Sequence, residues 1–235
     1  MKIRIQKCEM VSKTRYDFRR LEEEHALFLP CKVEEEKETV CMSFDMRGMS
    51  GFEELKGADR MKQLMVLAQV AELAKVYQDY DFALEPENLF YDVLGRVRVK
   101  NRDIISPDRK NRTKYFLRQY QALIGYILEG LHPYEDYLYG GLEILKMQDK
   151  HTVFFEPETV QEEKKILLEE YANLMENEKN LMKKVEIWKY KGLVRYCGVS
   201  VCLLVLLLFA VFYSFGWRMP KQDKLRTAGN AYIQK

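Results

Sequence analysis

The sequence predicts an α+β fold in which a folded N-terminal domain continues into a long helical stalk and a single transmembrane helix. Short apolar runs typical of strands mix with longer helical patterns over the first 155 residues. A later run, Tyr196–Trp217, contains no charged residue and matches the roughly 20 residues that span a bilayer. We therefore expect a cytosolic domain at 1–155, a stalk at 156–194, a transmembrane helix at 195–217 and the start of a truncated extracytoplasmic helical region at 218–235.

Composition argues against several classes of function. The formal net charge is only +2, and no basic run is interleaved with aromatic residues, so we expect no nucleic-acid partner. The five cysteines are odd in number and form no C-x-x-C pair, and the three histidines lie far apart in the sequence. The sequence therefore predicts free thiols in a reducing compartment, no metal site and no cofactor.

The first 46 residues are predicted to form strands. The N-terminus alternates apolar and polar residues, which predicts an edge strand with Ile3 and Ile5 on one face. Two apolar-rich runs, 25–33 and 38–46, are separated by a charged stretch and predict a hairpin.

Helical patterns dominate the next hundred residues. We expect a helix over 58–78 with Asp59 as its N-cap, and a second over 114–130 that ends at Gly130. Two short strands at 87–93 and 96–100 predict a hairpin between these helices. A third helix is predicted within 132–148, interrupted or started by Gly140-Gly141.

The apolar run is predicted to cross a membrane rather than to form a buried core helix, because it is long, uncharged and bordered by Arg195 and Arg218. Basic residues are almost balanced on its two sides, so the positive-inside rule does not decide its orientation. The large N-terminal domain has no signal peptide ahead of it, and we expect its three cysteines to be free thiols. We therefore expect a single-pass cell-membrane protein with a cytoplasmic N-terminus and an extracellular C-terminus.

One long helix is predicted from Pro157 into the membrane. Apolar residues recur along it at alternating spacings of four and three, with one polar break at Glu178. The seam consists of Leu167, Tyr171, Leu174, Leu181, Val185 and Trp188. The pattern favours a parallel homodimer through stalk and span, and the alternative is a helix that packs on its own domain.

The stretch Leu84-Glu85-Pro86-Glu87-Asn88 is similar to part of a protein-kinase catalytic loop, H-R-D-x-x-x-x-N. Anchored on Pro86-Glu87-Asn88, the alignment places Asn88 at the metal-binding asparagine. Ala83 then stands where the catalytic aspartate belongs, and Glu85 where many kinases have lysine. The spacing of the following hairpin places Asn101 at the metal-binding aspartate.

These replacements remove the chemistry of phosphoryl transfer. Alanine cannot accept a proton, and a neutral asparagine does not balance Mg²⁺ as a carboxylate does. Neither a glycine-rich phosphate loop nor a V-A-I-K lysine is evident in the sequence. We therefore predict a reduced protein-kinase-like (pseudokinase) domain that is not an enzyme. The alternatives are an unrelated α+β domain and, least favoured, an active kinase.

The order of elements and three stretches, Phe82–Asp92, Arg118–Gly130 and Tyr134–Leu145, resemble the EssB/YukC family. Members of this family are membrane-anchored pseudokinase components of the type VII secretion system of Gram-positive bacteria. The resemblance implies a cytosolic pseudokinase fold, an inside N-terminus and dimerisation. It also implies assembly with a membrane ATPase and a small ubiquitin-like cytosolic protein. Family members usually carry a sizeable extracytoplasmic domain, and we expect this chain to stop near its beginning.

The sequence thus predicts a non-catalytic scaffold subunit of a secretion apparatus that docks cytosolic and membrane partners. The alternative is a membrane-anchored kinase-like signalling receptor that still binds nucleotide. Tyr134, Tyr137 and Tyr139 are candidate docking residues, and packing in the core is an equal alternative for each.

Overall fold

The computed structural model of the chain describes residues 1–105, 111–141, 143–144, 154 and 156–216. These residues form an α+β fold, as predicted, and the chain divides into two compact units, Met1–Asn177 and Glu178–Lys235. The predicted tail at 218–235, Trp217 and most of the segment after Gly141 in the predicted third helix lie outside the described residues.

A small antiparallel sheet opens the first unit. Its strands β1 (Lys2–Gln6), β2 (Cys31–Glu35) and β3 (Thr39–Phe44) run in the order β1-β3-β2. The predicted edge strand and hairpin are confirmed, with Ile3 opposite Met42 and Ile5 opposite Val40. The sheet therefore leaves one edge of β1 unpaired within the described residues.

The prediction that residues 1–46 form only strands was wrong at one place. Helix α1 (Arg15–Glu22) lies between β1 and β2 and is started by a capping box in which Thr14 and Asp17 exchange hydrogen bonds. Its buried residues Phe18 and Leu21 pack against the sheet in a separate small core. The T-x-x-D pattern that starts this helix is present in the sequence.

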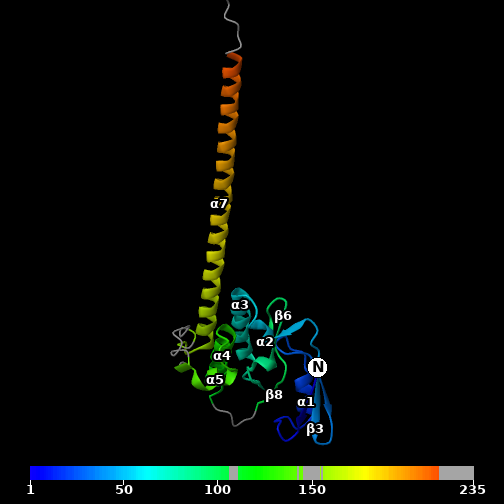
Figure 1. The fold of residues 1–235 in the computed structure, drawn as a ribbon. Helices are drawn as coiled ribbons and strands as arrows, with labels where there is room; N and C mark the ends of the chain where they lie inside the picture. The colour runs from blue at the N-terminus through cyan, green and yellow to red at the C-terminus, as the bar shows by residue number, and fades with distance from the viewer. Residues whose placement is uncertain (106–110, 142, 145–153, 155, 217–235) are drawn as a thin grey trace, which may run out of the picture. The chain divides into compact units, whose positions relative to one another are not determined.

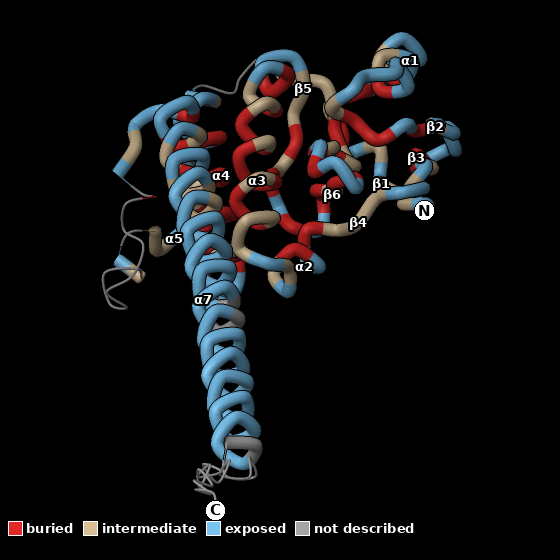
Figure 2. Tube along the Cα trace, turned by 90° about the horizontal axis from the view of Figure 1, so that it is seen from above, coloured by how far each residue is buried: buried red, intermediate tan, exposed pale blue. Residues whose placement is uncertain are grey.

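The main core lies among the helices that follow. Helix α3 (Arg60–Val70) continues as the 3₁₀ helix η1 (Ala71–Lys75) and packs beside α4 (Arg112–Leu128), which packs on α5 (Tyr134–Gly140). Figure 2 shows that buried residues concentrate on α3 and α4. As predicted, Asp59 caps α3 by accepting a hydrogen bond from the Lys62 amide at 2.9 Å.

Short strands connect the helices. The order β4-β6-β7 joins β4 (Met49–Gly51), which leads into α2 (Phe52–Leu55), to the predicted hairpin of β6 (Leu89–Asp92) and β7 (Val97–Val99). The hairpin turns at Gly95, where φ is +76° and an added Cβ would lie 2.7 Å from Met65. The last strands, β5 (Tyr80–Asp81) and β8 (Asp103–Ile104), pair antiparallel, with Asp81 opposite Asp103.

The aromatic residues of α5 divide between core and surface. Tyr134 and Tyr137 are buried in the main core, whereas Tyr139 is exposed. The packing alternative therefore holds for the first two residues, and of the three only Tyr139 is accessible to a partner. Gly130 follows α4 with φ of +64°, as expected for a glycine that ends a helix.

The long predicted helix is α7 (Val160–Gly216), and its first turns belong to the first compact unit. Leu167 is completely buried in the main core, and Tyr171 and Leu174 pack against that core. Arg60 of α3 donates to Glu170 at 3.0 Å, which adds a half-buried ion pair. The first three residues of the predicted seam therefore stabilise this chain's own domain.

The second half of the seam is exposed. Leu181, Val185 and Trp188 are 63%, 49% and 78% exposed. Beyond them, Val194–Ser214 has a mean hydropathy of 2.5 and is the one described helix long and apolar enough to cross a membrane. This segment overlaps the predicted span of 195–217, whose last residue lies outside the described part of the chain.

A buried carboxyl group lies in the first turn of α7. Glu163 is 0% exposed, one of its oxygens has no hydrogen-bond partner, and the other is 3.4 Å from Nε2 of Gln121 on α4. Burial raises the pKa of Glu163 to about 8, and the contact with Gln121 partly opposes this shift. The group is therefore mostly protonated at neutral pH.

We expect Glu163→Gln to stabilise the domain at pH 8 by on the order of 3 kcal/mol and to have little effect near pH 5. Between pH 5 and pH 8, Glu163 keeps its proton in the folded chain but has released it in the unfolded chain. The free energy of unfolding of the wild type therefore falls as pH rises. Thermal unfolding in detergent, followed by circular dichroism, measures the difference. The exposed Glu176→Gln on the same helix is the control, and equal shifts in both variants would contradict the assignment.

Candidate functional site

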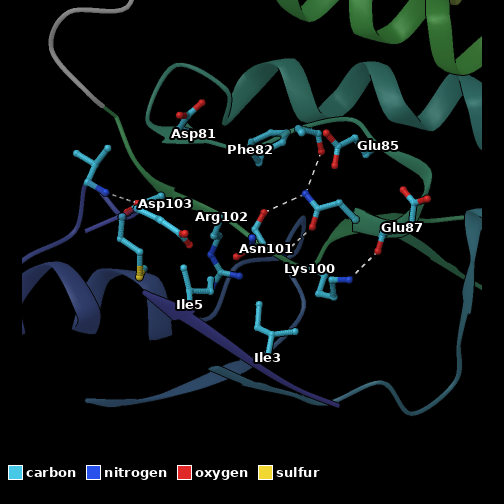
Figure 3. Close-up of a pocket in the computed structure, with 15 residues that line it drawn as sticks. Ile3, Ile5, Asp81, Phe82, Glu85, Glu87, Lys100, Asn101, Arg102 and Asp103 are labelled. Carbon is cyan, nitrogen blue, oxygen red and sulfur yellow. Dashed lines mark hydrogen bonds between the residues drawn. The ribbon is translucent and has the colours of Figure 1, made fainter. Parts of the chain in front are cut away.

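A cavity of about 500 Å³ lies in the first unit, beside the stretch that resembles a kinase loop. Its walls come from β1 and the segment after it, from residues 81–88, and from residues 100–103 that follow β7. Figure 3 shows Ile3 and Ile5 of β1 on one side and the loop bearing Glu85 and Glu87 on the other. The structure therefore brings the predicted loop positions into one cleft.

The side chain of Asn88 connects two segments that line the cavity, residues 81–88 and residues 100–103. Its Nδ2 donates to the carbonyl oxygens of Ala83 at 2.9 Å and Asn101 at 3.0 Å, and its Oδ1 accepts from the Asn101 amide at 2.6 Å. These bonds hold Ala83, Asn88 and Asn101 together. They also occupy both ends of the Asn88 amide, and its Oδ1, the atom that binds a cation, already accepts from a backbone amide.

The side chain of Gln119 on α4 holds the loop at Leu84, a role that no motif in the sequence indicated. The buried Gln119 accepts from the Leu84 amide at 2.9 Å through Oε1 and donates to the hydroxyl of Tyr77 at 3.3 Å. A polar residue among the inward apolar residues of a helix was the signal that could have found it.

The carboxylate nearest in sequence to Asn101, the expected metal-binding position, is Asp103, and it is already engaged. Asp103 accepts hydrogen bonds from the backbone amides of Val11 and Ser12 and from the Ser12 hydroxyl. It thus ties the segment after β1 to β8. No group of three or more His, Cys, Asp or Glu side chains suited to a metal exists in the described part of the chain.

The guanidinium of Arg102 is also engaged within the fold. Arg102 is 2% exposed, donates to the carbonyl oxygens of Leu29 at 3.2 Å and Leu21, and lies 4.3 Å from the ring centre of Phe28. Burial lowers the pKa of Arg102, and the nearby Cys31 thiol opposes the shift. The side chain anchors the cleft to the N-terminal sheet, and no sequence pattern indicated this role.

Acidic side chains outnumber basic ones around the cavity. Its ionisable residues are Glu9, Asp81, Glu85, Glu87, Asp103, Lys100 and Arg102. Loss of water raises the pKa of Glu85, and the nearby carboxylates of Glu87 and Glu135 raise it further. Lys100 donates to the backbone oxygen of Glu87 at 2.7 Å, and burial lowers its pKa. The electrostatic character of the cleft is therefore that of a site for cations.

Two solved structures resemble the fold of this chain. The chain shares the fold of an EssB cytoplasmic fragment from Staphylococcus aureus, with a TM-score of 0.60 and 21% identity over 72% of this chain and 99% of that one. An EssB cytoplasmic fragment from Geobacillus thermodenitrificans gives the same TM-score at 13% identity, over 76% of this chain and 87% of the other. None of the curated proteins matches the chain.

A family profile decides the relationship. The family described as protein YukC of the WXG100 protein secretion system (Wss) matches residues 5–235, nearly the whole sequence. The predicted resemblance is confirmed by this match. The chain belongs to the YukC family of the WXG100 protein secretion system.

Proposed function

We propose that this chain is a non-catalytic scaffold subunit of a WXG100, or type VII, secretion apparatus, and that its N-terminal domain is a reduced pseudokinase. Family membership supports a role in the secretion system, and Val194–Ser214 supports a membrane anchor. The observation that carries the absence of catalysis is the closed hydrogen-bond network of Asn88, with Ala83 where a proton acceptor would be needed.

The arrangement that we propose follows the predicted boundaries: a cytosolic domain at 1–155, a stalk at 156–194, a span at 195–217 and an extracellular continuation. Its docking partners are the membrane ATPase and the small ubiquitin-like cytosolic protein that the family resemblance implies. Both partners need a binding surface on the cytosolic side, and the first unit, Met1–Asn177, provides a compact body for it.

Purification from native membranes tests the scaffold directly. A tagged full-length chain, solubilised in mild detergent, is expected to retain the membrane ATPase of the same secretion system, identified by mass spectrometry. A chain with the same span but with residues 1–155 replaced by an unrelated soluble domain is the control. Equal recovery of the ATPase with both chains would refute docking through the N-terminal domain.

Nucleotide binding separates the scaffold from a kinase-like receptor. We expect Mg-ATP to leave the melting temperature of the full-length chain unchanged, because a ligand stabilises only a protein that it binds. Asn88→Asp should lower stability by about 3 kcal/mol, since it places carboxylate oxygens against the carbonyls of Ala83 and Asn101. Stabilisation of wild type or of Asn88→Asp by Mg-ATP would favour the receptor.

Dimerisation through the exposed half of the seam is a further part of the proposal. The double variant Leu181→Glu/Val185→Glu should shift the detergent-solubilised chain toward monomer, because it places like charges in a two-chain apolar interface. Light scattering after size exclusion measures the mass. Met182→Glu/Ile187→Glu, exposed residues outside the seam, is the matched control, and an unchanged mass in the first variant would refute the stalk dimer.

A further inference from the structure

The cleft beside the Asn88 loop has the properties of a preformed binding site. Its walls are fixed by contacts of three side chains: the buried amide of Asn88, the half-buried carboxylate of Asp103 and the buried guanidinium of Arg102. These side chains hold the surrounding segments and leave a cavity of about 500 Å³, within the range of small-molecule and peptide pockets. What it binds is decided by the groups that remain unpaired.

The unpaired groups are acidic. Among the described residues, the carboxylates of Glu9, Glu85 and Glu87 have no ion-pair or hydrogen-bond partner, while Asp81 lies 3.8 Å from the guanidinium of Arg112. Loss of water raises the pKa of Glu85, and the negative charges of the nearby Glu87 and Glu135 raise it further. A cation placed between Glu85 and Glu87 would relieve this repulsion.

The two basic residues of the cleft do not reverse this charge. Arg102 is buried and donates to backbone carbonyls of the N-terminal part, so it is not presented to a ligand. Lys100 holds the backbone oxygen of Glu87 with its ammonium group. A triphosphate in this cleft would meet several carboxylates against the single ammonium of Lys100 among the described lining residues, and would be repelled.

The opposite wall is apolar and extended. Ile3 and Ile5 are half-buried, they line the cavity together with Met10, and they belong to strand β1, whose other edge pairs with no described strand. An extended peptide can bind beside such a strand while its apolar side chains contact the isoleucines. The combination of an apolar wall and an acidic rim distinguishes a peptide from an isolated metal ion.

We propose that this cleft binds an extended segment of a protein partner in which arginine or lysine alternates with apolar residues. The basic side chains would lie at Glu85 and Glu87, and the apolar ones on Ile3 and Ile5. This inference rests on the proposed scaffold function, for which it supplies one docking site and the chemistry of the segment that fits it.

Fluorescence anisotropy with a defined probe tests the assignment. The full-length chain in detergent is titrated against a short fluorescein-labelled peptide in which arginine alternates with valine. We expect Glu85→Gln/Glu87→Gln to weaken binding about five- to tenfold, because two charge-assisted contacts are lost. Glu34→Gln/Glu38→Gln, which makes the same charge change at exposed sites on the β2–β3 hairpin, should change binding less than about twofold.

Two further probes define the class of ligand. Replacing arginine by neutral citrulline, or valine by glycine, should each weaken binding, since the cleft offers both an acidic rim and an apolar wall. Equal loss in the two glutamine variants would show non-specific charge attraction and overturn the proposal. Displacement of the peptide by Mg-ATP would also overturn it, because the cleft would then be a nucleotide site.

The result is separable from the scaffold function. If the secretion-system ATPase co-purifies with the chain but Glu85→Gln/Glu87→Gln binds the arginine–valine peptide as wild type does, the scaffold stands and the cleft assignment fails. If peptide binding behaves as expected but the ATPase does not co-purify, the scaffold fails and the cleft is a peptide site of another function.

Discussion

The cleft of the N-terminal domain depends on one side-chain amide. The Asn88 side chain donates to the backbone oxygen of Ala83 in the loop. It also donates to the backbone oxygen of Asn101 and accepts from the Asn101 amide, just after the hairpin. Neither neighbour supplies these bonds through its own side chain, so the geometry rests on backbone groups that would otherwise lack partners. The asparagine that the sequence pattern aligned with the metal-binding asparagine of kinases connects a loop and a hairpin in this structure.

This connection leaves the carboxylates of the cleft with different tasks. Asp103 accepts hydrogen bonds from backbone amides of the segment after β1, so its carboxylate is already bound inside the fold. Glu85 and Glu87 are not used in this way and stand at the mouth of the cavity. Loss of water raises the pKa of Glu85, the nearby carboxylates of Glu87 and Glu135 raise it further, and an unpaired carboxylate held in this way costs some stability. A cost of this kind at a concave surface is typical of a binding site.

Local signals predicted much of the fold, because they depend on neighbouring residues. The edge strand, the two hairpins and the Asp59 cap follow from alternation and from capping chemistry. The predicted α-helix over 58–78 ends early, at Val70, and the chain continues as a 3₁₀ helix over Ala71–Lys75. Arg102 could not be predicted as an anchor, since its acceptors, Leu21 and Leu29, lie far away in the sequence.

The seam of α7 shows the limit of periodicity most clearly. Apolar residues at alternating spacings of four and three indicate that one face of a helix is apolar. They do not indicate whether that face packs against the same chain or against another. The structure answers this for the first half, where Leu167 is buried in the main core. The polar break at Glu178 coincides with the boundary between the two compact units. Before Glu178 the seam therefore completes the domain, and after Glu178 its apolar residues are exposed, which leaves them accessible for the contact with a second chain that we propose.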